Sequence, residues 1–197
     1  MKAEVPEYAV QEDVRVDPDT TALLVIDMQN NFVKQGGGLL VPEAEATVPA
    51  IKGLLDLARA SRMRVLYSQD THRPGDREWD VWPAHCREGS WGWEIITELA
   101  PAGGETVVRK ITYDAFYGTP LDHLLRLWGV CTLVICGTVA NMSVQYTAAS
   151  AALRSYAVVI PRDGISALEP FDLEASLRQT AFVLAGQVTT AEGVRLL

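Results

Sequence analysis

Short apolar runs alternate along the chain with longer amphipathic stretches. Six of the runs are nearly continuous in apolar, often β-branched residues, and they cover positions 21–27, 64–68, 106–109, 131–137, 156–160 and 187–190. Such runs predict strands that are covered on both faces, as in a parallel sheet. The first run, TALLVID, ends on a carboxylate, which is an unusual residue to close a buried strand.

Between these runs, apolar residues recur at helical spacing. Val48, Ile51, Leu55 and Ala58 would share one face of a helix. Residues 121–128 follow the same pattern and stop at Gly129, and the stretches 143–154 and 172–185 complete the set. Strands that alternate with helices predict a doubly wound α/β domain. Residues 71–93 break the alternation, and a long connection of this kind is usually functional.

Length and charge narrow the class of protein. The 197 residues predict one domain over 1–197, with residues 1–18 as an N-terminal extension. A net charge of −8 argues against nucleic acid and anionic membrane as partners. We find neither a secretory signal nor an apolar run long enough to span a membrane. Three unevenly spaced cysteines indicate reduced thiols and a cytoplasmic location.

Polar residues follow four consecutive predicted strands, at the edge where open parallel sheets bind ligands. The first strand ends at Asp27, the second at Asp70 with His72 beyond it, and the third at Lys110. The fourth leads into the turn 137–143. This convergence predicts a site in which Asp27 and Lys110 could exchange a proton and hold charge. Taken singly, Asp27 could also cap a helix, and Lys110 could be a solvated strand end.

Ser143 follows the fourth strand at the predicted start of a helix. Backbone N–H groups and the helix dipole there would suit an oxyanion, and a nucleophile at this position would benefit from both. Position alone nevertheless favours a simpler role for Ser143 as the N-cap of the helix.

The long loop carries a candidate metal site. Asp70, His72 and His85 form a plausible ligand set for a divalent ion with an open coordination position. A fourth oxygen could come from Asp76, Glu78 or Asp80. A loop of hydrogen-bonded polar residues is the alternative, and His123, in a later helix, is expected at the surface. Among the aromatic residues, Phe32 and Trp82 are candidates to wall a pocket for a flat substrate.

Three ordered segments resemble the isochorismatase-like hydrolases, and within them the nicotinamidase-related cysteine amidohydrolases. They are LVIDMQNNF at 24–32, RKITYDAF at 109–116 and VICGTVANMSV at 134–144. The resemblance covers about residues 21–190. It implies a three-layer αβα fold with a six-stranded parallel sheet and helices on both faces. It also implies hydrolysis of a small amide at a carbon–nitrogen bond other than a peptide bond, by a homo-oligomer (a dimer or a tetramer).

The resemblance also implies roles for individual residues. In relatives, a cysteine thiolate attacks the amide carbonyl while the residues matching Asp27 and Lys110 move the proton and stabilise charge. Backbone N–H groups at the nucleophile and near Val139 hold the oxyanion, beside a cis Thr138–Val139 peptide bond. The segments 70–72 and 82–86 are similar to nicotinamidase metal-binding segments, which implies zinc on Asp70, His72 and His85, with Glu78 as a further ligand. Phe32 and Trp82 fall where such enzymes sandwich a ring. Thr71 and Arg73 depart from the usual Trp and Pro, which weakens the case for nicotinamide.

The largest departure is that Ser143 stands at the family's cysteine position. A serine hydroxyl is far less acidic than a thiol, so we expect a pocket that binds substrate and turns it over slowly or not at all. An engineered trapping substitution would explain the serine, and so would a natural, non-covalent isochorismatase reaction in which Asp27 acts with water on a vinyl ether. A catalytically silent ligand-binding protein is a third alternative. The metal loop and the retained Asp27 and Lys110 favour the amidohydrolase. None of the three cysteines, Cys86, Cys131 and Cys136, precedes a predicted helix as a nucleophile would.

Overall fold

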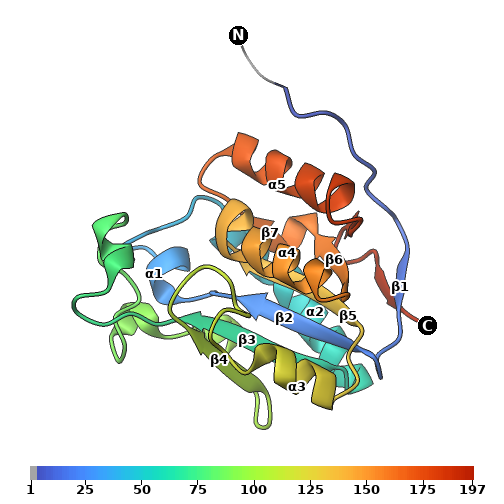
Figure 1. The fold of residues 1–197 in the computed structure, drawn as a ribbon, viewed down its shortest axis with the longest axis horizontal. Coiled ribbons are helices and arrows are strands. Elements are labelled where there is room, and N and C mark those ends of the chain that lie inside the picture. The colour runs from blue at the N-terminus through green and yellow to red at the C-terminus, as the bar shows by residue number, and fades with distance from the viewer. Residues whose placement is uncertain (1–3) are drawn as a thin grey trace.

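A parallel sheet forms the centre of the molecule (Figure 1). The computed structural model describes residues 4–197. Six strands lie in the order β4 (Thr106–Lys110), β3 (Arg64–Asp70), β2 (Thr21–Ile26), β5 (Thr132–Thr138), β6 (Ala157–Pro161) and β8 (Gln187–Thr189). A two-residue strand, β7 (Ile165–Ser166), continues the sheet beside β5 as its seventh member. The predicted α/β class and its six principal strands are therefore confirmed.

Helices cover both faces of the sheet (Figure 1). On one face lie α3 (Leu121–Leu127), α4 (Gln145–Leu153) and α5 (Pro170–Phe182), and α2 (Val48–Ser61) lies on the other. The short helix α1 (Asn30–Val33) follows β2 directly. Every residue of β2 is buried, which explains its apolar run. No helix of residues 4–197 is long and apolar enough to cross a membrane.

Helix α2 shows how the sequence pattern produces one packed face. Its buried residues are Ile51, Leu54, Leu55 and Ala58, at helical spacing, and they contact the sheet core. Pro49 lies in the first turn, where no backbone donor is needed, and Arg62 ends the helix in the left-handed conformation. The predicted helical face at 48–58 therefore agrees with the structure.

Two further strands form a separate pair that the sequence pattern does not predict. Strand β1 (Val14–Val16) runs parallel to β9 (Val194–Leu196), with Val14 opposite Val194. Because β1 lies within residues 1–18, this part of the expected extension packs against the C-terminal strand. The three cysteines are free thiols, two of them buried.

The approach of β5 to β2 at the end of both strands requires a glycine. Gly137 has a φ of +115°, and a Cβ at this position would overlap the carbonyl oxygen of Ile26.

We expect Gly137→Ala to lower the free energy of unfolding by about 3 kcal/mol or more, measured by urea denaturation, because the backbone strain and the steric overlap add. Gly53→Ala is the control, since Gly53 lies on α2 with open space around it. It should raise stability by about 0.5–1 kcal/mol. Equal midpoints for the Gly137 variant and the unmodified chain would contradict this account.

Candidate active site

A buried lysine lies between two buried carboxylates at the carboxyl ends of three neighbouring strands. The ammonium nitrogen of Lys110 lies 2.7 Å from Asp27 Oδ2 and 2.9 Å from Asp70 Oδ1. All three side chains are almost completely inaccessible to solvent. The convergence of Asp27, Asp70 and Lys110 that the strand order predicts is present in the structure.

Neighbouring side chains hold the Asp27 carboxylate and the main chain of Asp70 in place. Ser68 donates a hydrogen bond of 2.6 Å to Asp27 Oδ1. The buried amide of Gln29 pairs with the main chain of Asp70: its nitrogen donates to the Asp70 carbonyl oxygen at 2.9 Å, and its oxygen accepts from the Asp70 N–H at 2.8 Å. Sequence reasoning did not assign a role to Gln29 or Ser68. One sequence signal could have identified Gln29. It is a side-chain amide two residues after Asp27, the acid that closes the first predicted strand.

The two carboxylates on Lys110 have opposite pKa shifts. Burial raises the pKa of Asp27, an effect that Lys110 opposes and Asp70 reinforces. Burial acts on Asp70 as well, but Lys110 and the two histidines outweigh it and hold the pKa of Asp70 well below its usual range. Burial alone would lower the pKa of Lys110, but the two carboxylates raise it. Acids with divergent pKa values suit different roles. The arrangement suits Asp27 to carry a proton and Asp70 to stay ionised.

Ser143 faces the lysine instead of capping a helix. It is buried within the π-helical turn Ala140–Val144, and α4 begins only at Gln145. The Lys110 ammonium donates to Ser143 Oγ at 3.4 Å. The N-cap expectation for Ser143 is therefore wrong. The preceding Thr138–Val139 peptide bond is cis, as the family resemblance implies.

Asp70, His72, Glu78 and His85 gather within 4.8 Å of one another, each offering one possible ligand atom. Asp70 Oδ2 lies 2.9 Å from His72 Nε2 and 3.3 Å from His85 Nε2. Glu78 Oε1 lies 3.9 Å from His72 Nε2 and 3.8 Å from His85 Nε2. Because two imidazoles and two carboxylates suit zinc, this donor set fits a divalent ion.

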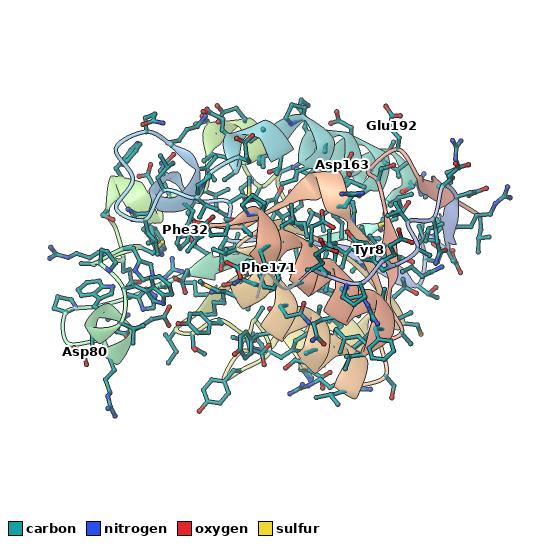
Figure 2. The ribbon with its side chains drawn as sticks, turned by 90° about the horizontal axis from the view of Figure 1, so that it is seen from above. Tyr8, Phe32, Asp80, Asp163, Phe171 and Glu192 are labelled. Carbon is teal, nitrogen blue, oxygen red and sulfur yellow. The ribbon has the colours of Figure 1, made fainter. Side chains whose placement is uncertain are left out.

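The Nδ1 atoms of His72 and His85, which face away from the cluster, also have hydrogen-bond partners. Asp76 lies 2.9 Å from His72 Nδ1 and accepts the N–H of Glu78 with its other oxygen, while His85 Nδ1 lies 2.8 Å from the Pro83 carbonyl. Such outer partners are typical of metal-binding histidines. Asp76 is thus an orienting residue rather than the fourth ligand. Asp80 is exposed at the outer end of the loop and is not a ligand either (Figure 2).

The charge state of His72 bears on ion binding. Burial would lower its pKa, but hydrogen bonds and charge from Asp70 and Asp76 raise the pKa of His72 to about 9. A protonated imidazole cannot ligate an ion, so ion binding must displace this proton. The third histidine, His123, is exposed on α3 as expected.

A small pocket opens onto Ser143 and the candidate ligands. Phe32, Trp82 and Tyr113 supply aromatic walls, and the indole N–H of Trp82 donates to the Tyr113 hydroxyl at 2.8 Å. The remaining lining residues are Leu39, Asp70, Glu78, His85, Thr138, Val139, Met142 and Ser143. Phe32 and Trp82 line the pocket as predicted, while Leu39, Tyr113 and Met142 were not assigned to its walls from the sequence.

The other tryptophans of the loop hold it together. The indole of Trp79 donates to the His85 carbonyl oxygen, and that of Trp93 donates to the Thr71 hydroxyl. Trp91 is half-exposed. None of these three rings lines the pocket next to Ser143.

The existing cysteines do not take the nucleophile's place. Cys86 and Cys136 are buried, and burial raises the pKa of both thiols. Cys131 is exposed just before β5, at the opposite end of that strand from Ser143. None of the three lines the pocket.

This fold is that of an isochorismatase-type hydrolase. A sequence model of the isochorismatase domain matches residues 21–193, and the chain belongs to this family. It is 32% identical over 164 residues to a ureidoacrylate amidohydrolase of Caulobacter segnis, covering 69% of this chain and 68% of the relative.

Two solved structures show the same likeness. N-carbamoylsarcosine amidase of Thermoplasma acidophilum is 34% identical with a TM-score of 0.81, over 88% of this chain and 97% of the other. Pyrazinamidase of Pyrococcus horikoshii, in complex with zinc, is 25% identical with a TM-score of 0.78, over 90% of this chain and 98% of the other.

Proposed function

We propose that the chain is an amidohydrolase that acts on a small amide, and that serine at the nucleophile position slows the reaction. The arrangement of Lys110 between Asp27 and Asp70, with Ser143 beside it, is the observation that carries this proposal. The relatives named as amidohydrolase and amidase support it. Ammonia release from small amides by the Ser143→Cys variant is the experiment that tests it.

The side chains of this site suit nucleophilic acyl transfer. The nucleophile at position 143 forms a bond to the amide carbonyl carbon, and its proton passes to Asp27. Backbone N–H groups around Val139 and the turn Ala140–Val144 would hold the oxyanion. Collapse of the adduct breaks the carbon–nitrogen bond, and Asp27 returns the proton to the departing amine. Water then hydrolyses the acyl-enzyme, and Lys110 keeps the ionised groups stable throughout.

Serine changes the first of these steps. The described structure gives Ser143 no histidine base, and Oγ accepts a hydrogen bond from a cation. Asp27 is a weak base for a hydroxyl, so attack by Oγ is slow. Substrate therefore stays bound in the pocket for much longer than a cysteine enzyme would need to hydrolyse it. The same feature supports the second candidate function, in which Asp27 activates water for non-covalent hydrolysis of a vinyl ether. A silent ligand-binding protein would share the pocket and lack both reactions.

A divalent ion, with zinc as the first candidate, would be held by Asp70, His72, His85 and Glu78. When bound, such an ion supplies Lewis-acid polarisation of a substrate atom near the pocket. Asp76 and the Pro83 carbonyl keep both imidazoles turned toward the cluster. The zinc complex of the pyrazinamidase relative supports the assignment.

We expect the protein dialysed against zinc to retain about one ion per chain. At a hundredfold excess over the dissociation constant, binding would add about 2.7 kcal/mol and raise the melting temperature by roughly 5–10 °C. Elemental analysis and thermal melting with and without a chelator measure both effects. His85→Ala should abolish them. His123→Ala is the matched control, because His123 is exposed on α3. Absence of bound metal together with indifference to the chelator would remove the site.

We further propose a homo-oligomer, a dimer or a tetramer, acting in the cytoplasm on a small molecule. The resemblance to oligomeric relatives carries this part of the proposal, and the exposed Leu153 of α4 and Phe182 of α5 are compatible with it. The net charge of −8 argues against polyanions as partners.

A further inference from the structure

We infer that the pocket selects small amides that carry no carboxylate, so that its substrate is a neutral or positively charged amide. This inference rests on the proposed function and specifies the substrate class of the same site. It follows from the charges and the walls that a substrate would meet beyond its reacting amide group.

Acidic groups outnumber basic ones around the pocket. Asp70 and Glu78 line it directly, Asp27 lies behind Asp70 across the lysine, and Asp76 lies behind His72. Among the described residues at the pocket, Lys110 is the one side chain with a permanent positive charge, and Asp27 and Asp70 already contact it on both sides. Carboxylates therefore outnumber the ammonium, and they still do so when Asp27 carries a proton.

A divalent ion at the histidine cluster would offset this excess of negative charge without adding a basic side chain to the pocket wall. While the cluster holds no ion, the potential in the pocket is negative, and it repels a substrate carboxylate.

No cation on the walls is placed to offset that repulsion. Within the described residues, the pocket lining contains neither arginine nor lysine. Two nearby arginines are directed elsewhere: Arg73 and Arg109 pair with Glu88, and Arg109 also lies over the ring of Trp93. A carboxylate entering here would lose its hydration and find no arginine or lysine on the pocket wall to pair with.

The walls do suit uncharged and cationic groups. Phe32, Trp82 and Tyr113 present aromatic rings, which attract cations as well as flat neutral groups. Glu78 offers a carboxylate that accepts from substrate N–H groups. The pocket therefore combines a negative field with aromatic faces. Ureidoacrylate, for which one relative is named, is itself a carboxylate, so the inferred substrate class differs from the one in that relative's name.

Two matched sets of amides test the inference. One set is β-alaninamide (cationic), butyramide (neutral) and succinamate (anionic). The other is 4-(aminomethyl)benzamide, 4-methylbenzamide and 4-carbamoylbenzoate. Calorimetry on the full chain gives dissociation constants, and ammonia release by the Ser143→Cys variant gives kcat/KM. We expect the neutral and cationic members to bind, and to be cleaved, at least about tenfold better than the anionic one.

Measured on protein dialysed against a chelator, Glu78→Gln removes one negative charge from the pocket at nearly constant size, and it should reduce that preference severalfold. Asp80→Asn is the matched control, because Asp80 is exposed on the same loop outside the pocket, and it should leave the preference unchanged (Figure 2). Tight binding of the anionic members, or an unchanged preference in Glu78→Gln, overturns the inference and leaves the amidohydrolase proposal intact. Failure of every amide to bind and to react overturns both.

Discussion

Replacing Ser143 with cysteine is expected to raise amide hydrolysis by about 10³-fold or more, equivalent to roughly 4 kcal/mol of activation free energy. A thiol loses its proton near neutral pH, particularly beside a cation, whereas a serine hydroxyl does not. The Lys110 ammonium, 3.4 Å from Ser143 Oγ, would stabilise the thiolate. The measurement is ammonia release from nicotinamide, pyrazinamide, and ureido and carbamoyl compounds.

Two controls isolate the thiol as the cause. Ser143→Ala should show no gain, and an alkylating reagent should remove the gain of the cysteine variant. The introduced thiol would lie beside the Lys110 ammonium, whereas burial raises the pKa of the Cys86 and Cys136 thiols, so it would be more reactive than either. The exposed Cys131 is present in the unmodified chain as well, which controls for its alkylation. No increase over the unmodified chain with any compound of the panel would contradict a covalent mechanism. It would favour non-covalent hydrolysis through Asp27 or a binding role.

Lys110→Met is expected to lower the free energy of unfolding by about 3–5 kcal/mol near neutral pH, because two buried carboxylates would lose their shared counter-charge. Urea denaturation across a pH series measures this loss. Lys52→Met is the matched control, since Lys52 forms an exposed ion pair with Asp56 on α2. It should change stability by less than about 1 kcal/mol.

The pH dependence of the Lys110 variant should have the opposite sign to that of the unmodified chain. In the unmodified chain the pKa of Asp70 is lowered, so its contribution is present above its unfolded pKa of about 4 and is lost as pH falls. Without Lys110, burial would raise the pKa of the remaining carboxylates above about 4. The variant should then lose stability as pH rises through that range. Adding Asp27→Asn should restore part of the loss, and equal effects of Lys110→Met and Lys52→Met would refute the ion-pair account.

The central strands β2, β3, β5 and β6 could be predicted because they are covered on both faces. A strand such as β2, with every residue buried, leaves an apolar run that cannot be mistaken for a surface loop. Strands β1, β7 and β9, like β8, are only two or three residues long, so periodicity could not decide whether they form strands. Their pairing depends on where the chain ends meet the sheet, and local sequence does not encode that.

The candidate site could be predicted as far as parallel topology determines it. Asp27, Asp70 and Lys110 close neighbouring parallel strands, so their meeting follows from the strand order alone. The backbone path of the long loop does not follow from that order. It decides that Asp76 turns to the outer nitrogen of His72 while Glu78 faces the cluster.

The surroundings of Ser143 depend on a backbone irregularity. A regular helix from this position would have made it an N-cap. In the π-helical turn, the N–H of Val144 instead reaches the Val139 carbonyl oxygen at 3.2 Å, five residues back. Ser143 then lies inside the turn and contacts Lys110. No residue type in 138–144 marks such a turn, so the sequence pattern could not reveal it.

Asp70 contacts different partners with its two oxygens. Oδ1 contacts the lysine, and Oδ2 contacts both histidines. In evolutionary terms, this residue belongs to two sites and is constrained by both. A descendant that lost His72 and His85 would still need an acid here to neutralise Lys110, whereas one that lost the acid would lose both sites in a single step. Among divergent members of the family, we therefore expect the acid at this position to persist in chains from which the histidines have disappeared.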